Sequence, residues 1–243
     1  MAQLSSGIEI AAADVRLGGR LVLEGLALWL TEGRIGIMGR NGSGKTTLLR
    51  LIAGLIAPDR WRVRVDGFDP FTDRRAAVAG LGILFQNPDH QILFPTVEEE
   101  LAFGLAQKGL AQAEALAQAN AALQSEERAH WAKEPVTSLS QGQRHYLCLL
   151  SVLLMAPRTI LLDEPLAGLD LPTQARLARL FAALPQRLVT ITHDPATVAG
   201  CDRVLWLEAG RIAADGPQDA VLPVFAAEMA RIGASDADAD LAG

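Results

Sequence analysis

A glycine-rich run that ends in lysine and threonine is the segment whose residue types and spacing most directly indicate chemistry. Residues 39–46 read Gly-Arg-Asn-Gly-Ser-Gly-Lys-Thr and satisfy the phosphate-loop pattern G-x-x-x-x-G-K-[ST]. Glycines let successive backbone N–H groups turn toward one anion, and a helix that starts there adds its positive dipole end. The predicted nucleotide contacts are Gly39, Arg40, Asn41, Gly42, Ser43, Gly44, Lys45, Thr46 and Thr47.

Two adjacent acids follow an apolar segment later in the chain. Asp163 and Glu164 come directly after Ile-Leu-Leu at 160–162. Successive side chains of a strand point in opposite directions, so one acid can hold Mg²⁺ while the other faces an attacking water. Taken alone, the pair could equally cap the next helix. With a phosphate loop in the same chain, the pair predicts a hydrolytic site, with Thr46 as a second Mg²⁺ ligand.

Two further polar residues end apolar segments. Gln86 follows residues 81–85 and His193 follows residues 188–192, positions where a solvated surface residue would be unremarkable. The place of His193, one strand beyond the acid pair, favours contact with a γ-phosphate. The remaining histidines lack the spacing of a metal site, and the nucleophile pattern Gly-x-Ser-x-Gly is absent from the sequence.

These residues need a sheet whose strands end at one edge. Apolar runs predict strands at 35–38, 61–66, 81–85, 159–162 and 188–192, and helical periodicity predicts helices at 45–55, 142–155 and 171–183. This alternation predicts an α/β fold with a parallel sheet. Hairpins are expected at 8–30 and 204–214, a strand-free helical insertion at 96–133, a helix at 218–232 and a disordered tail at 234–243.

Composition limits where the chain can work. The 243 residues carry a formal charge of -6 and no run rich in Lys or Arg, which argues against a nucleic-acid partner. No signal peptide is seen at the N-terminus. The longest apolar run, residues 146–156, is about half of what a membrane helix needs. A role at a membrane is therefore expected to require a partner.

The motifs GRNGSGKT, ILFQNPDHQ, LSQGQ, ILLDEP, AGLD and ITHD, in this order over residues 8–216, resemble the ATPases of ABC transporters. The resemblance implies a RecA-like P-loop NTPase core, an N-terminal antiparallel β subdomain and an inserted helical signature subdomain. It implies one domain over 1–233, with the core at 1–87 and 157–216, the helical subdomain at about 88–156 and a C-terminal helix at about 218–232.

The resemblance also implies roles. Glu164, His193 and Gln86 would be catalytic, and ATP would bind with Mg²⁺ held by Thr46, Gln86 and Asp163. The signature residues Ser140, Gly142 and Gln143, with Asp170, would act on ATP bound by a second protomer.

A finer resemblance lies in residues 85–104, which look like the ATPases of energy-coupling factor importers. Within that group NPDHQI, LSQGQR and HDP are most similar to biotin-uptake members, while cobalt and nickel members share much of the stretch. The implied partners are a second ATPase protomer (a copy or a related subunit), a membrane scaffold with coupling helices and a substrate-binding membrane subunit. The implied location is the cytoplasmic face of the cell membrane, as a peripheral subunit.

Two other hypotheses fit less well. A soluble ABC protein of DNA repair or translation would carry long coiled coils or tandem cassettes, and a nucleotide sensor without hydrolysis would not need Glu164 and His193. Two positions depart from the family pattern. Leu17 stands where many ABC ATPases place an aromatic residue on adenine, and Gln141 stands where the signature usually has glycine.

Overall fold

A six-stranded sheet forms the centre of the molecule. The computed structural model describes residues 6–234, so the predicted tail lies outside the described residues except for Ala234. The strand order is β5-β6-β7-β3-β8-β9. All neighbouring pairs are parallel except β8 with β9, which is antiparallel. The strands are β3 (Arg34–Met38), β5 (Leu81–Leu84), β6 (Thr159–Asp163), β7 (Arg187–Thr192), β8 (Arg203–Glu208) and β9 (Arg211–Gly216).

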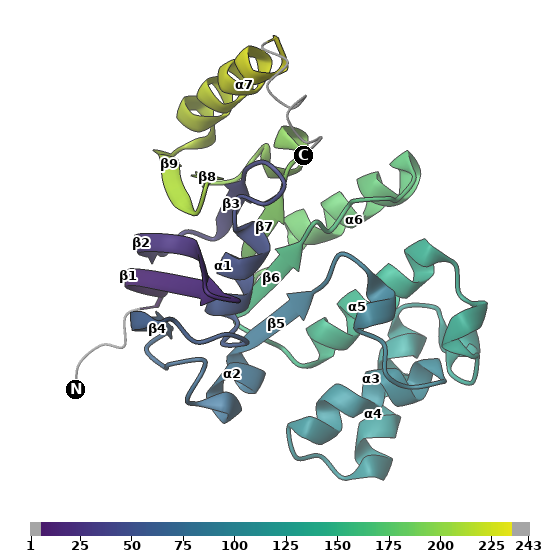
Figure 1. Cartoon of the computed structure of the whole chain (residues 1–243). Helices are drawn as coiled ribbons and strands as arrows, with labels where there is room; N and C mark the ends of the chain where they lie inside the picture. Colours follow the sequence, from purple (N-terminus) through teal and green to yellow (C-terminus); the bar gives the residue numbers. More distant parts are fainter. Residues whose placement is uncertain (1–5, 235–243) are drawn as a thin grey trace.

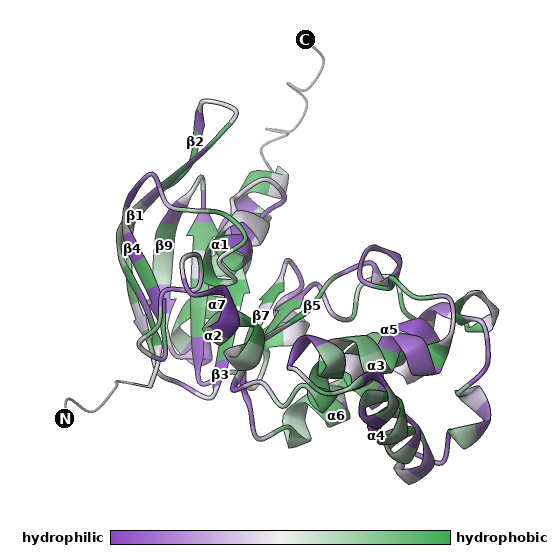
Figure 2. Ribbon diagram, turned by 90° about the horizontal axis from the view of Figure 1, so that it is seen from below, coloured by the Kyte–Doolittle hydropathy of each residue, from purple (hydrophilic) through white to green (hydrophobic). Residues whose placement is uncertain are grey.

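The central strands are buried because helices and a second sheet cover them. Strands β3, β6 and β7 are buried along nearly their whole length, as expected for parallel strands covered on both faces. Figure 2 shows the hydrophobic residues concentrated in these interior strands, with hydrophilic stretches in the outer helices and loops. The expected α/β fold with a parallel sheet is therefore confirmed.

The helices of the core are α1 (Lys45–Ile52), α2 (Arg74–Gly80) and α6 (Leu171–Ala183). The prediction that the first helix continues to Leu55 was wrong. Gly54 turns the chain with a φ of 68°, and an added Cβ there would lie 2.2 Å from the Pro70 carbonyl oxygen. Helix α2 was not predicted from the sequence; its N-cap is Asp73, whose side chain accepts a hydrogen bond from the Ala76 N–H.

A three-stranded antiparallel sheet, in the order β2-β1-β4, lies against the core. Its strands are β1 (Ile8–Leu17), β2 (Arg20–Leu30) and β4 (Arg60–Val65), and the first two form the expected hairpin. Its apolar side chains share one buried cluster with β3, α1 and β7. Figure 1 shows this sheet packed beside α1.

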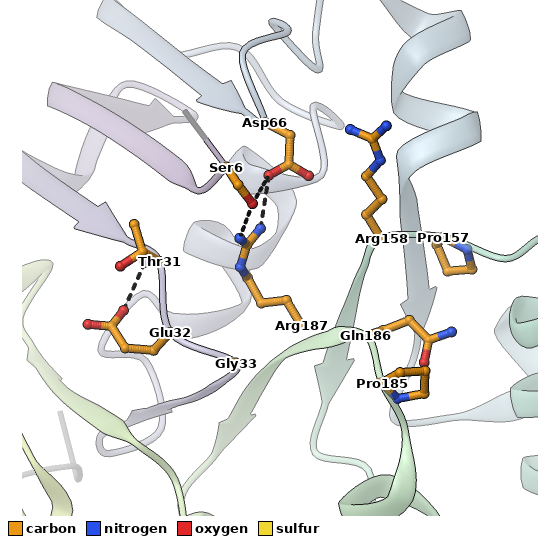
Figure 3. A pocket seen from close by; sticks show the side chains of 10 residues that line it. All are labelled: Ser6, Thr31, Glu32, Gly33, Asp66, Pro157, Arg158, Pro185, Gln186 and Arg187. Carbon is orange, nitrogen blue, oxygen red and sulfur yellow. Dashed lines mark hydrogen bonds and ion pairs between the residues drawn. The ribbon is translucent and has the colours of Figure 1, made fainter. Parts of the chain in front are cut away.

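A buried ion pair fastens this sheet to the central one. Asp66, directly after β4, lies 3.1 Å from Arg187 at the start of β7, and both side chains are at least nine-tenths buried. Arg187 also donates to the Thr159 hydroxyl of β6, and Asp66 accepts from the Gly7 N–H. Figure 3 shows this pair in the wall of a cavity at the amino ends of β6 and β7, away from the strand ends that carry the predicted site.

The helical insertion predicted at 96–133 contains α3 (Val97–Gln107), α4 (Gln112–Ser125) and the 3₁₀ turn η2 (Ala129–Trp131). The 3₁₀ turn η3 (Val136–Ser138) and α5 (Gln141–Leu154), the helix predicted at 142–155, follow it. These elements bury a hydrophobic cluster of their own, and Figure 1 shows them as a separate group beside the sheet. Two more 3₁₀ turns, η1 (Pro88–His90) and η4 (Pro195–Val198), follow β5 and β7.

Helix α7 (Gln218–Ala234) packs on β8 through Phe225, whose ring lies edge-on to Trp206. It runs two residues further than predicted, so Ala234 is helical rather than part of the tail. Among residues 6–234 no helix is long and apolar enough to cross a membrane.

Candidate nucleotide-binding site

The predicted phosphate loop, acid pair, glutamine and histidine meet at one edge of the central sheet. Strands β5, β6, β7 and β3 are consecutive in the sheet, and the loops after their carboxyl ends carry these residues. Ligands of parallel sheets bind at this edge. A cleft of about 400 Å³ lies there, lined by Val22, Asn41, Gly42, Gly44, Lys45, Thr46, Thr47, Gln86, Asp163, Glu164 and His193.

The loop between β3 and α1 has the form of an anion cradle. An added Cβ at Gly39 would lie 2.1 Å from the Leu207 carbonyl oxygen, so only glycine allows this close approach. Gly44, the N-cap of α1, has a φ of 104°, and among the described residues no side chain caps the first turn. The uncapped N–H groups at this helix start are free to bind a phosphate.

Two polar groups in the loop are suited to binding an anion. The Ser43 Oγ is buried and has no hydrogen-bond partner within residues 6–234. The Lys45 ammonium is almost fully buried, and it donates to the carbonyl oxygens of Gly39 (2.7 Å) and Arg40 (2.9 Å). A buried cation held only by carbonyl groups is well placed to bind phosphate oxygens.

Lys45 and the nearby carboxylates influence one another's pKa values. Burial lowers the pKa of Lys45, while the carboxylates of Glu164, Asp163 and Glu208 act in the opposite direction. Burial, followed by the nearby Glu164 carboxylate, raises the pKa of Asp163, and Arg50 and Lys45 oppose this shift. A cation entering the cleft would relieve the repulsion between the two acids.

Glu164 is held by the last residue of β7 and by the residue that follows it. Its Oε1 lies 2.8 Å from His193 Nδ1, and its Oε2 accepts a 3.1 Å hydrogen bond from the Thr192 hydroxyl. The residue itself has a φ of 48°, an uncommon backbone conformation for a residue other than glycine, and its N–H donates to the Ile191 carbonyl oxygen. The carboxylate is therefore fixed in direction before any nucleotide enters.

Thr192 is a site residue that the sequence reasoning missed. Its hydroxyl donates to Glu164 and accepts from the Asp194 N–H at 3.0 Å. Thr192 therefore holds both the Glu164 carboxylate and the turn after β7 in position. The available signal was a hydroxyl residue at the end of an otherwise largely apolar strand. Val22 also lines the cleft, and Leu17, the position without an aromatic ring, does not belong to the lining.

The signature residues do not line this cleft. Ser140 is the N-cap of α5 and forms a capping box with Gln143: each side chain bonds the backbone N–H of the other residue. An added Cβ at Gly142 would lie 3.0 Å from Thr173 Cγ2 of α6, so this glycine allows the two helix starts to approach. Asp170 caps α6 by accepting a hydrogen bond from the Thr173 N–H. Hydrogen bonding to the Thr173 side chain, followed by that to its backbone, lowers the pKa of Asp170.

Gln141 lies beside this junction within its own chain. Its side-chain amide nitrogen would lie 3.6 Å from a Cβ added at Gly168. Gly39 and Arg40 border a neighbouring cavity of about 760 Å³, together with His193 and residues of α7. Within the described chain, no group of three or more His, Cys, Asp or Glu residues could hold a metal ion.

The family model described as ABC transporter matches residues 23–167, which include the phosphate loop, the signature and the acid pair. The chain belongs to the ABC transporter family. As an ABC transporter ATPase it binds ATP and couples ATP hydrolysis to transport.

Two curated relatives and one solved structure define the neighbourhood of this ABC ATPase. It is 52% identical over 230 residues to the biotin transport ATP-binding protein BioM of Rhodobacter capsulatus, covering 93% of this chain and 98% of the relative. It is 34% identical to the cobalt import ATP-binding protein CbiO of Syntrophus aciditrophicus, covering 84% and 75%. The structure of cbiO1 from Clostridium perfringens, part of the transporter complex cbiONQ, matches with a TM-score of 0.74 at 26% identity, covering 94% of both chains.

Proposed function

We propose that this ABC ATPase is the motor subunit of an energy-coupling factor importer that takes up biotin. The similarity to BioM over nearly the full length of both chains carries this proposal. The same motor role for cobalt, nickel or another vitamin is the second candidate, because a cobalt import ATPase is also a relative.

The cleft fits Mg²⁺ as well as ATP. Thr46, Gln86 and Asp163 line it together and supply hydroxyl, amide and carboxylate oxygens, the donor class that Mg²⁺ prefers. We propose these three residues as the ligands. When bound, Mg²⁺ would supply positive charge beside the phosphate oxygens.

The residues of the chain divide the work of hydrolysis. Lys45 and the N–H groups of the phosphate loop bind the β- and γ-phosphates. Glu164, fixed by Thr192 and His193, orients a water for in-line attack on the γ-phosphorus and accepts its proton. The Nε2 of His193 makes no hydrogen bond within residues 6–234 and is free to meet the γ-phosphate.

The site is completed by a second protomer in this proposal. Ser140, Gly142, Gln143 and Asp170 lie outside the cleft of their own chain but at two adjacent helix starts, where N–H groups can bind a facing γ-phosphate. ATP then holds two protomers together, and hydrolysis releases them. We propose that the Gln86 region contacts the coupling helices of a membrane scaffold and transmits the closing motion to them. In this proposal the scaffold also binds a substrate-binding subunit, and the chain lies at the cytoplasmic face of the membrane.

The substrate is tested by co-expression with candidate scaffold and substrate-binding subunits. Labelled biotin is expected to accumulate in cells in an ATP-dependent way, and not when Lys45→Ala replaces the wild-type chain. Accumulation of cobalt or nickel without biotin would reject biotin as the substrate.

The sandwich mechanism is tested separately with Glu164→Gln. This variant keeps the shape of the side chain but cannot accept the proton, so it is expected to bind ATP, lose turnover by at least about 100-fold and elute as an ATP-bound dimer. A variant that stays monomeric with ATP and its membrane partners would contradict the mechanism.

A further inference from the structure

The Gln86 loop, residues 86–89, is fastened to the signature helix α5 by side chains from two of its turns. Arg144 Nε lies 3.0 Å from Asp89, and Cys148 Sγ lies 4.0 Å from the Pro88 carbonyl oxygen. Between these contacts, His145 reaches Gln86 itself. The loop is thus tied to the helix that carries the signature residues.

His145 differs from its neighbours in burial and in what it joins. Its side chain has no exposed surface, and its Nε2 lies 3.2 Å from the Gln86 carbonyl oxygen. Its Nδ1 lies 3.3 Å from the carbonyl oxygen of Gln141, the first residue of α5. A neutral imidazole carries one N–H and can donate to one of these carbonyls, and only the doubly protonated ring donates to both.

The His145 ring does more than fill space in the core. Burial of a polar ring is unfavourable unless its nitrogens are hydrogen-bonded, and an apolar side chain would fill the same space without that requirement. The two partners of the ring belong to the two functional segments of the fold: the glutamine that lines the nucleotide cleft and the first turn of the signature helix.

We propose that His145 is a positioning residue that couples the Gln86 backbone to the first turn of α5. This inference rests on the proposed catalytic role of Gln86. Because the ring is enclosed in a packed core, a shift of the Gln86 backbone displaces it and with it the helix start that carries Ser140 and Gln143. Gln86, which lines the nucleotide cleft of its own protomer, thereby moves the signature residues that contact ATP bound by the facing protomer.

Two substitutions separate the two nitrogens of the ring. The side-chain amide of His145→Gln ends about where Nε2 lies and can still donate to Gln86. The shorter amide of His145→Asn ends about where Nδ1 lies and reaches only Gln141. Both variants are polar and similar in size, so each serves as the control for the packing effects of the other. Cys148→Ala, one turn further along α5, controls for general loosening of the same seam.

In steady-state ATPase assays, His145→Asn is expected to lower kcat about tenfold with an unchanged KM for ATP, because the phosphate loop is untouched. His145→Gln is expected to stay within about threefold of wild type, and Cys148→Ala, which removes only the long contact to the Pro88 carbonyl oxygen, is expected to lower kcat less than His145→Asn does. Equal kcat values for the Asn and Gln variants, or a loss that follows the thermal unfolding temperature in all three variants, would overturn the proposal.

Hydrogen exchange on the wild-type chain gives a second test that needs no folded variant. At a protein concentration low enough to keep the chain monomeric, so that residues 139–145 meet no facing nucleotide, adding ATP is expected to change exchange in residues 86–91 and 139–145 together, and a change confined to one segment would overturn the coupling. A wild-type chain without ATPase activity would contradict the proposed function instead, so the two failures are distinguishable.

Discussion

At the scale of single residues, the hydroxyl of Thr192 holds the acid that is proposed to activate water. Thr192→Val keeps the shape of the side chain but removes the hydrogen bond to Glu164. A hydrogen bond to a charged group is worth about 1.5–3 kcal/mol, so kcat is expected to fall about 10- to 100-fold. ATP affinity should stay unchanged, because the phosphate loop is not altered.

Thr190→Val provides the matched control for this prediction. Thr190 lies two residues earlier in the same strand and is also buried, but the acid is bonded to Thr192. Steady-state kinetics and nucleotide-binding titrations on both variants check the expectation. An equal loss of kcat in the two variants would mean that strand packing, and not the Glu164 bond, determines the rate.

Tyr146 is the single tyrosine of the chain, which makes its ionisation directly observable. Burial, followed by the hydrogen bond to Glu126, raises the pKa of Tyr146 to about 12. Tyrosine in an unfolded chain ionises near pH 10. The stabilisation linked to this group is thus fully present below about pH 10 and is lost as the pH rises toward 12.

Ultraviolet absorbance of phenolate checks this expectation. The native protein should remain without phenolate signal at about pH 10.5, whereas the chain in denaturant should already be more than half ionised. Tyr146→Phe should show no such signal in either state. Identical titration curves for native and denatured protein would contradict the buried environment of the ring.

At the scale of elements, the Asp66–Arg187 pair joins the antiparallel sheet to the central sheet. Asp66 has a φ of 47°, a conformation that asparagine also tolerates, so Asp66→Asn changes the charge with little backbone cost. It leaves Arg187 buried without its counter-charge, which is expected to lower the free energy of unfolding by about 3–5 kcal/mol.

Urea denaturation measures this loss. Glu228→Gln removes one partner of the exposed pair between Glu228 and Arg231 on α7 and is expected to leave the midpoint unchanged. If the two variants shifted the midpoint equally, the pair between the sheets would not be a structural fastening.

Some of the strands and helices could be predicted from the sequence, and others could not. The apolar runs before Gly39, Asp163 and His193 sufficed to predict their strands, because parallel strands buried on both faces are continuously hydrophobic. Helix α2 was not predicted because it has only seven residues, begins with two arginines and ends with a glycine. Its apolar residues are too few to show helical periodicity. The Glu164–Thr192 bond and the place of His145 depend on which strands and helices become neighbours, and periodicity within one segment does not contain that information.

At the scale of the whole molecule, the proposed sandwich can be tested by mixing two inactive chains. Lys45→Ala damages the phosphate loop, and Ser140→Asp keeps a good helix cap but places a negative charge against the facing phosphate. A mixed dimer has one site in which both elements are intact. If two copies of this chain pair, mixing is expected to restore about one quarter of the wild-type ATPase activity.

Each variant alone should be inactive, and the restored activity should rise and fall with the ratio of the two chains. No recovery at any ratio would indicate that the signature serves its own chain or that a different ATPase subunit is the natural partner. Size-exclusion chromatography of the mixture with ATP establishes whether the mixed dimer forms.

Gly142 lets the starts of α5 and α6 pack closely, and this packing affects how the two helices can move. With no side chain between them, the helix starts that hold Ser140 and Asp170 lie against each other at Thr173. Because the two helix starts pack against each other here, we expect these two surfaces to approach a facing protomer together. A partner would meet both at once or neither, so engagement is expected to be all-or-none, without a stable half-closed intermediate.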